Sequence, residues 1–145
     1  MDLDFLVHRS DLDKLHEILS NLGYRRVHAS ENVSQYHHRD HLWGSVDFIH
    51  AFREVSLAML ARTKRYPAFG AKLKIPTLEP EDVIGLKVQA MSNDPERRAQ
   101  EVNDIERLAA RHGAKLDWER ISEFYRVFDR EDEAKELKRR FGNVE

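Results

Sequence analysis

Hydrophobic and polar residues alternate over much of the first half of the chain, and hydrophobic residues recur at helical spacing through the second half. The alternating runs predict five strands, at residues 2–7, 24–29, 33–38, 44–51 and 71–75. Helical spacing predicts helices at residues 10–22, 53–63, 80–92, 94–112 and from residue 117 onward. Strands that come mainly before helices predict an α+β fold.

The length of 145 residues predicts one domain, which is long enough to bury a core. Residues 1–78 are predicted to form its sheet core, and residues 79–145 the C-terminal helical part of the same domain. Ser10 is predicted to cap the first helix and Gly23 to end it. We find no repeat, low-complexity tract or long linker that would divide the chain.

Two acidic residues in the first strand carry the most specific chemical prediction. Asp2 and Asp4 are two positions apart, so in a strand their carboxylates point to the same side, about 6–7 Å apart. Asp47 adds a third carboxylate if its strand pairs beside the first. Such an oxygen-rich group suits one or two Mg²⁺ ions. A frayed acidic N-terminus with a solvated Asp47 explains these residues equally well.

Lys87 lies at the centre of the apolar face of the helix predicted at residues 80–92, where an amphipathic helix ordinarily carries leucine. A lysine directed at the core has to reach solvent or meet an acidic partner or ligand, and this favours a functional role. Asp104 is a candidate partner for Lys87 or for Arg98. Glu101 and Asp104 are equally explained as solvated acids at a helix edge.

Four histidines cluster in the predicted meander, at positions 37, 38, 41 and 50. Imidazoles bind transition metals, so His37, His41 and His50 form a candidate metal site. Their spacing fits no established zinc pattern, and adjacent strand residues face opposite ways. Surface histidines at the rim of the sheet are therefore the favoured interpretation.

The composition narrows the class of protein without naming a function. Hydrophobic residues make up 41% and charged residues 34%, which is typical of a globular chain and not of a disordered one. The net charge of −2 argues against general attraction to nucleic acids or membranes, but it leaves room for a local basic patch. The absence of cysteine excludes disulfides and thiolate chemistry. No apolar run has the length of a signal or membrane span, so a cytoplasmic location is expected.

Four segments taken together resemble a known family: Asp2-Leu3-Asp4, Val46-Asp47-Phe48, residues 81–90 and residues 98–105. In this order they resemble the AbiEii-type nucleotidyltransferase-like toxins of the polymerase-beta-like nucleotidyltransferase superfamily. The resemblance covers about residues 1–112, and it rests on the order of the segments because no single motif is specific. It implies a mixed β-sheet with helices packed on it.

The resemblance also implies a reaction and roles for particular residues. Asp2, Asp4 and Asp47 would hold Mg²⁺ and a nucleoside triphosphate, while Lys87, Arg98 and Asp104 would bind the nucleotide. The implied reaction is in-line transfer of a nucleotidyl group to an acceptor hydroxyl on RNA or protein. An antitoxin is an implied partner. An uncovered first strand at a sheet edge would also invite a second copy of the chain to form a homodimer.

Two departures from the family pattern bear on these expectations. The family carries a Gly-Ser or Gly-Gly loop before its acidic pair, and the loop's backbone amides hold phosphates, whereas this sequence starts at Met1 directly before Asp2. Glu101 and Gln100 stand where the family more often has Asp and Lys, respectively. A second hypothesis is therefore a catalytically incomplete fold that acts as a binding or regulatory module.

Overall fold

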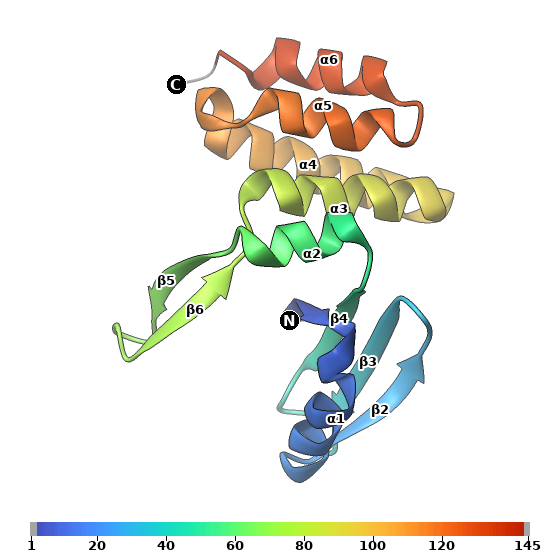
Figure 1. The fold of residues 1–145 in the computed structure, drawn as a ribbon, viewed down its shortest axis with the longest axis vertical. Coiled ribbons are helices and arrows are strands. Elements are labelled where there is room, and N and C mark those ends of the chain that lie inside the picture. The colour runs from blue at the N-terminus through green and yellow to red at the C-terminus, as the bar shows by residue number, and fades with distance from the viewer. Residues whose placement is uncertain (1–2, 144–145) are drawn as a thin grey trace. The chain divides into compact units, whose positions relative to one another are not determined.

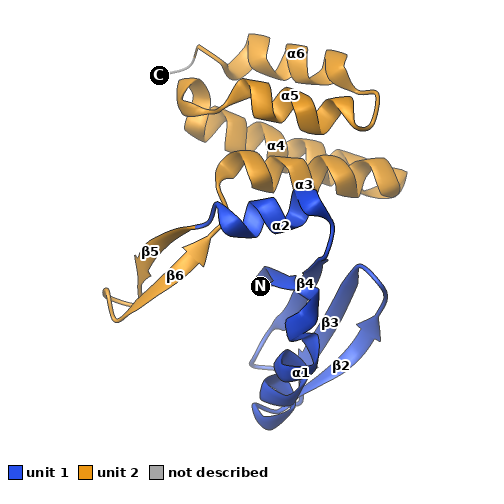
Figure 2. Ribbon diagram, in the orientation of Figure 1, with its two compact units in different colours: residues 1–63 blue, residues 64–145 orange. Residues whose placement is uncertain are grey.

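The computed structural model describes residues 3–143, which fold into two compact units (Figures 1 and 2). The first unit comprises Met1–Thr63 and the second Lys64–Glu145. The boundary between the units lies after Thr63. From the sequence, the sheet part was predicted to end at residue 78. That the two units belong to one domain stays a prediction.

The first unit is built on a four-stranded mixed sheet in the order β1-β4-β3-β2. Its strands are β1 (Leu3–His8), β2 (Tyr24–Ala29), β3 (Val33–His38) and β4 (Ser45–Ala51). β1 runs parallel to β4, while β3 pairs antiparallel with both β4 and β2. The predicted meander, the mixed α+β sheet and the edge position of the first strand are thus confirmed.

Two helices complete the first unit, α1 (Leu12–Asn21) and α2 (Glu54–Ala61). α1 packs on one face of the sheet, because its buried Leu19 and partly buried Leu15 join a cluster with Tyr36, Val46 and Phe48. In each strand, the residues that alternate with these core residues point to the opposite face of the sheet. That opposite face is where the predicted acidic site lies.

Ser10 does not cap α1, contrary to the prediction. Residues Arg9–Asp11 form a 3₁₀ turn, and the Ser10 hydroxyl lies 2.7 Å from Nδ1 of His8. Asp11 occupies the position before α1 and makes no capping hydrogen bond with its side chain. The short polar side chain of Ser10 therefore stabilises the turn that joins β1 to the helix.

The second unit combines a β-hairpin with four helices. The hairpin consists of β5 (Lys64–Ala68) and β6 (Leu73–Thr77), and the helices are α3 (Pro80–Asn93), α4 (Arg98–His112), α5 (Trp118–Arg126) and α6 (Glu131–Phe141). The helices enclose a core that includes Ile84, Val88, Ile105 and Ile121. No helix among residues 3–143 is long and apolar enough to cross a membrane.

The sequence missed β5 and placed Pro76 at the end of a strand, whereas Pro76 lies inside β6 opposite Arg65. Pro67 likewise lies inside β5, opposite Lys74. A two-stranded hairpin tolerates proline because each strand has an outer edge at which no partner needs the missing N–H. The two prolines are thus compatible with the hairpin, although they make its strands harder to predict from the sequence.

Candidate functional site

The parallel register of β1 and β4 brings two predicted site residues side by side. Asp4 is the direct partner of Asp47, and neighbouring strands lie about 4.8 Å apart. Residues paired across adjacent strands project to the same face of the sheet. Asp4 is exposed and Asp47 half-buried, so their carboxylates can meet a ligand from solvent. Asp2 lies outside the described residues.

Gln35 on β3 extends this row by one strand, because it is the register partner of Asp47. Its Nε2 donates a hydrogen bond of 3.0 Å to Oδ2 of Asp47. The bond leaves Oδ1 of Asp47 available and restricts the rotation of the carboxylate. Sequence reasoning missed Gln35, although its place in the alternation of residues 33–38 puts it on the same face once β3 is known to pair with β4.

The opposite face of the same two strands is held by aromatic packing. Phe5 stacks on Phe48 with ring centroids 5.5 Å apart, and Tyr36 meets Phe48 edge to face at 5.8 Å. Phe5 follows Asp4 and Phe48 follows Asp47, so the stacked rings fix the strand segments that carry the acids. The packing therefore positions the carboxylates without contacting them.

In the second unit, Lys87 on α3 is held by two carboxylates of α4. Its Nζ donates to Oδ2 of Asp104 at 2.8 Å and to Oε2 of Glu101 at 3.0 Å. Arg97 donates to the other oxygen of Glu101 at 2.6 Å. The expected meeting of Lys87 with Asp104 is confirmed, while Glu101, only 2% exposed, is not the solvated acid of the alternative interpretation.

The two acids keep Lys87 protonated. Burial by itself would lower the pKa of Lys87, but the hydrogen bonds to Asp104 and Glu101 outweigh burial and raise the pKa above its ordinary value of 10.5. The ammonium has three N–H donors, and the described hydrogen bonds use two of them. With its side chain 26% exposed, Lys87 can offer the third donor to an anionic ligand.

Arg98 does not join Lys87. Its Nη2 forms an ion pair of 3.1 Å with Oε2 of Glu133 on α6. The guanidinium is therefore already engaged, and a nucleotide phosphate would have to compete with Glu133 for it.

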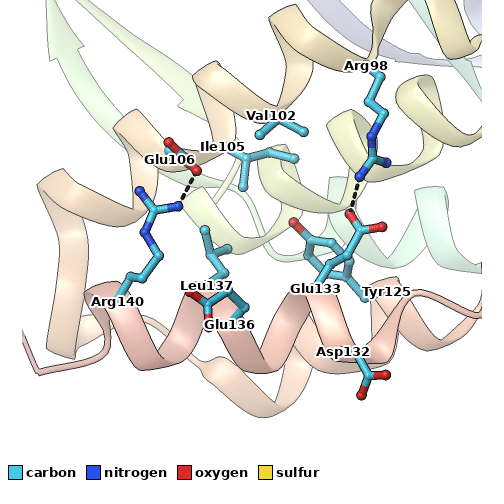
Figure 3. Close-up of a pocket in the computed structure, with 10 residues that line it drawn as sticks. All are labelled: Arg98, Val102, Ile105, Glu106, Tyr125, Asp132, Glu133, Glu136, Leu137 and Arg140. Carbon is cyan, nitrogen blue, oxygen red and sulfur yellow. Dashed lines mark hydrogen bonds and ion pairs between the residues drawn. The ribbon is translucent and has the colours of Figure 1, made fainter.

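The Arg98–Glu133 pair lies at one end of a cavity of about 350 Å³ between α4, α5 and α6, and the Arg140–Glu106 pair lies at the other (Figure 3). Between the two pairs the lining includes apolar side chains, namely Val102, Ile105 and Leu137. Burial raises the pKa of the Tyr125 phenol, which also lines this cavity and so stays neutral. The cavity thus has apolar side chains at its middle and an ion pair at each end.

The histidines do not form a common site. His37 pairs with Ser45 on the face that carries Asp47, whereas His50 lies on the opposite face, where its Nε2 is 3.0 Å from the Ser34 hydroxyl. His38 lies with Nε2 2.9 Å from the carbonyl oxygen of Leu22. Among residues 3–143 no three histidine or acidic side chains come together as a metal-binding group.

The chemistry of the Asp4–Asp47 pair fits Mg²⁺. Magnesium prefers oxygen ligands, keeps several waters and is commonly held by one or two carboxylates together with substrate phosphates. Two adjacent carboxylates on an accessible sheet face supply such a donor set.

The comparison with protein families gives a match over most of the chain. The model of a family described as "Uncharacterised nucleotidyltransferase" matches residues 1–129. This range includes all the predicted site residues, from Asp2 to Asp104. No curated protein matches the sequence.

Proposed function

The chain belongs to this family of nucleotidyltransferases, and from that premise we propose that it transfers a nucleotidyl group from a nucleoside triphosphate to an acceptor hydroxyl in a Mg²⁺-dependent reaction. The observation that carries the proposal is the direct pairing of Asp4 with Asp47 on adjacent parallel strands. Nucleotidyl transfer requires charge neutralisation at the phosphates, and paired carboxylates are the groups that hold the necessary cation.

In this proposal Asp2, Asp4 and Asp47 hold the magnesium and thereby the triphosphate. Bound Mg²⁺ would withdraw charge from the phosphate oxygens and orient the triphosphate for attack. Gln35 fixes the carboxylate of Asp47 in one orientation through its hydrogen bond of 3.0 Å. The aromatic stack beneath the acids holds their strands in register, so the donor set is preorganised.

Lys87, Arg98 and Asp104 are proposed to bind nucleotide, as the family resemblance implies. Lys87 is suited to this role because its charge is secured by two acids and one N–H donor remains unused in its described contacts. Asp104 then acts as a positioning residue for Lys87. Arg98 would contribute only after it exchanges its ion pair with Glu133 for a phosphate.

The finer assignment to the AbiEii type is part of the same proposal, together with an RNA or protein acceptor, an antitoxin partner and a homodimer formed through the edge strand β1. The four motif segments support this assignment, and β1 has the edge position that strand pairing would need. Transfer assays with RNA and protein acceptors, in the presence and absence of added magnesium, address the reaction directly.

The decisive experiment is calorimetric titration of the protein with each nucleoside triphosphate in the presence of Mg²⁺. We expect the wild type to bind at least one triphosphate and the variant Asp4→Asn to lose binding, because the amide cannot replace a charged ligand. Asp13→Asn removes one exposed acid from α1 of the same unit and serves as the matched control. Equal affinities of wild type and Asp4→Asn would reject the site. Binding without transfer to any acceptor would instead favour the non-catalytic module.

A further inference from the structure

The β5–β6 hairpin concentrates positive charge in a chain that is slightly acidic overall. Residues 64–77 contain four of the 24 lysines and arginines and none of the 26 acidic residues, while the whole chain carries a net charge of −2. Figure 1 shows the hairpin extending away from the helices of its own unit. The hairpin is therefore a basic arm on a unit that is otherwise rich in acids.

Three of these four cations have no acidic partner in the described part of the chain. Lys64 at the base of the hairpin pairs with Glu79 at 2.8 Å. Arg65, Lys72 and Lys74 are exposed and form no ion pair among residues 3–143. By contrast, most arginines of α4, α5 and α6 pair with carboxylates, as Arg120 does with Glu79 at 2.7 Å. The hairpin thus presents charge that the protein leaves uncompensated.

Exposed aromatic rings accompany these cations. The register pairs Tyr66 with Ile75 and Ala68 with Leu73, which places these side chains on one face, while Arg65 and Lys74 lie on the other. Tyr66 is 54% exposed, and Phe69 in the connecting turn is 72% exposed. Large aromatic rings exposed to water are unfavourable, and binding to a partner that covers them removes this cost.

We propose that the β5–β6 hairpin is a binding arm for single-stranded nucleic acid. Arg65, Lys72 and Lys74 would contact phosphates, and Tyr66 and Phe69 would stack on bases. The hairpin carries uncompensated cations on one face and an exposed aromatic ring on the other, with a second ring in the turn. Proteins hold single strands with cations that contact phosphates and with aromatic rings that stack on the unpaired bases. A duplex buries those faces and would use the cations alone.

The proposed binding does not depend on the proposed reaction. The bound strand could also supply the acceptor hydroxyl, and this further step rests on the proposed nucleotidyl transfer. The two ideas separate experimentally, because Asp4→Asn removes a metal ligand in the first unit and leaves the hairpin intact. This variant should bind a nucleic acid strand as the wild type does, whether or not it binds a triphosphate.

The test is fluorescence anisotropy with labelled oligouridylate and oligothymidylate of about 20 nucleotides, which is longer than a typical single-strand site. We expect the triple variant Arg65→Gln/Lys72→Gln/Lys74→Gln to bind about 10-fold or more weakly, and the slope of log affinity against log salt to fall by about two. The variant Tyr66→Ala/Phe69→Ala should weaken binding about 5-fold or more for each base that loses its stack. Binding to either oligonucleotide supports the arm, and a preference between them reflects the 2′-hydroxyl or the methyl group of the base.

Two matched controls make the test specific. Arg107→Gln/Arg111→Gln/Lys115→Gln removes three exposed cations of the same unit and gives the same net charge as the hairpin triple variant. Trp43→Ala removes an aromatic ring that is 62% exposed outside the hairpin. Both controls should retain wild-type affinity.

Three outcomes would overturn the proposal. They are absence of wild-type binding to either oligonucleotide at low salt, equal weakening in the hairpin and control triple variants, and binding to vesicles of anionic phospholipid in preference to the oligonucleotides. The last outcome would assign the hairpin to a membrane surface.

Discussion

The two units hold their conspicuous acidic residues in opposite ways. In the first unit, Asp4 and Asp47 stand side by side as like charges, and Asp47 accepts a hydrogen bond from the neutral amide of Gln35. In the second unit, Glu101 is nearly inaccessible to solvent and is bonded to two cations, Lys87 and Arg97. Glu101 and its neighbour Asp104 are thus compensated by cations of the same unit.

This difference distinguishes charges that maintain the fold from charges suited to a ligand. A buried carboxylate without cations would cost several kcal/mol, so the bonds of Glu101 are a structural requirement. Asp4 and Asp47 instead lie side by side on a face that solvent reaches, where two carboxylates can share a cation with a substrate phosphate. The comparison therefore agrees with the metal site proposed for the first unit, and it predicts that removing acids from the two units has different consequences.

The largest effect is expected from Asp47→Asn. The asparagine oxygen can still accept the Gln35 hydrogen bond, so the free energy of unfolding should change by less than about 0.5 kcal/mol. Magnesium-dependent transfer should fall by more than about 100-fold, beyond the range seen when only a supporting residue is removed. Transfer assays and urea unfolding measure the two quantities. Unchanged transfer would remove Asp47 from the site.

The variant Glu101→Ala should instead lower the stability of the second unit. It leaves Arg97 without its partner and Lys87 with Asp104 alone, and the loss of these charge-assisted hydrogen bonds costs about 2 kcal/mol of unfolding free energy. The matched control is Glu106→Ala, whose exposed pair with Arg140 contributes at most about 1 kcal/mol. Equal losses in the two variants would show that burial of Glu101 does not matter.

A smaller effect on function is expected from Gln35→Leu. Leucine fills a similar volume but cannot orient the carboxylate of Asp47, and loss of such a supporting hydrogen bond typically lowers metal affinity about 10-fold. Titration with magnesium at a fixed triphosphate concentration measures this change. The variant Gln35→Glu also loses the donor, but its added negative charge attracts the cation, so it should weaken binding less than Gln35→Leu does. Wild-type affinity in both variants would exclude Gln35 from any positioning role.

The smallest effect concerns the stability of the second unit in acid. Hydrogen bonds from Arg120 and then from Lys64 lower the pKa of Glu79 from its ordinary value of 4.5 to about 2. Because the unfolded chain takes up this proton first, the contribution of Glu79 is complete above about pH 4.5 and is lost as the pH falls towards about 2. Urea midpoints at about pH 5 and about pH 3 should therefore differ less in Glu79→Gln than in the wild type or in the exposed-site control Glu96→Gln. An identical pH dependence in all three proteins would contradict this assignment.

The helices, the strands and the faces of the strands were predictable from local spacing. Which strands and side chains contact one another was only partly predictable. Alternation places Asp4 and Asp47 on the face opposite to Phe5 and Phe48, and the structure confirms that the two strands are neighbours. Of the two rings only Phe48 is buried, since Phe5 on the edge strand is 44% exposed. Gln35 escaped notice because its role depends on β3 pairing with β4, which is a contact between segments distant in the sequence. The partner of Lys87 was predictable from the helical positions of the acids around it, since α3 and α4 are consecutive helices.

The hairpin shows where local spacing fails. Residues 64–68 contain a proline and two cations and no alternating apolar pattern, so they read as the end of a helix. These residues form a strand because they pair with β6, and burial in a core does not contribute. For the same reason the sheet part was expected to extend to residue 78, while the first compact unit of the structure ends at Thr63.

The positions of Pro67 and Pro76 have a consequence for the behaviour of this protein at high concentration. An unpaired strand edge ordinarily offers a row of N–H groups on which other chains can assemble into extended sheets. Each outer edge of the hairpin carries one proline, which removes a donor from that row and obstructs the approach of another strand. The arm can therefore present bare aromatic rings to solvent while resisting the growth of fibrils from its edges.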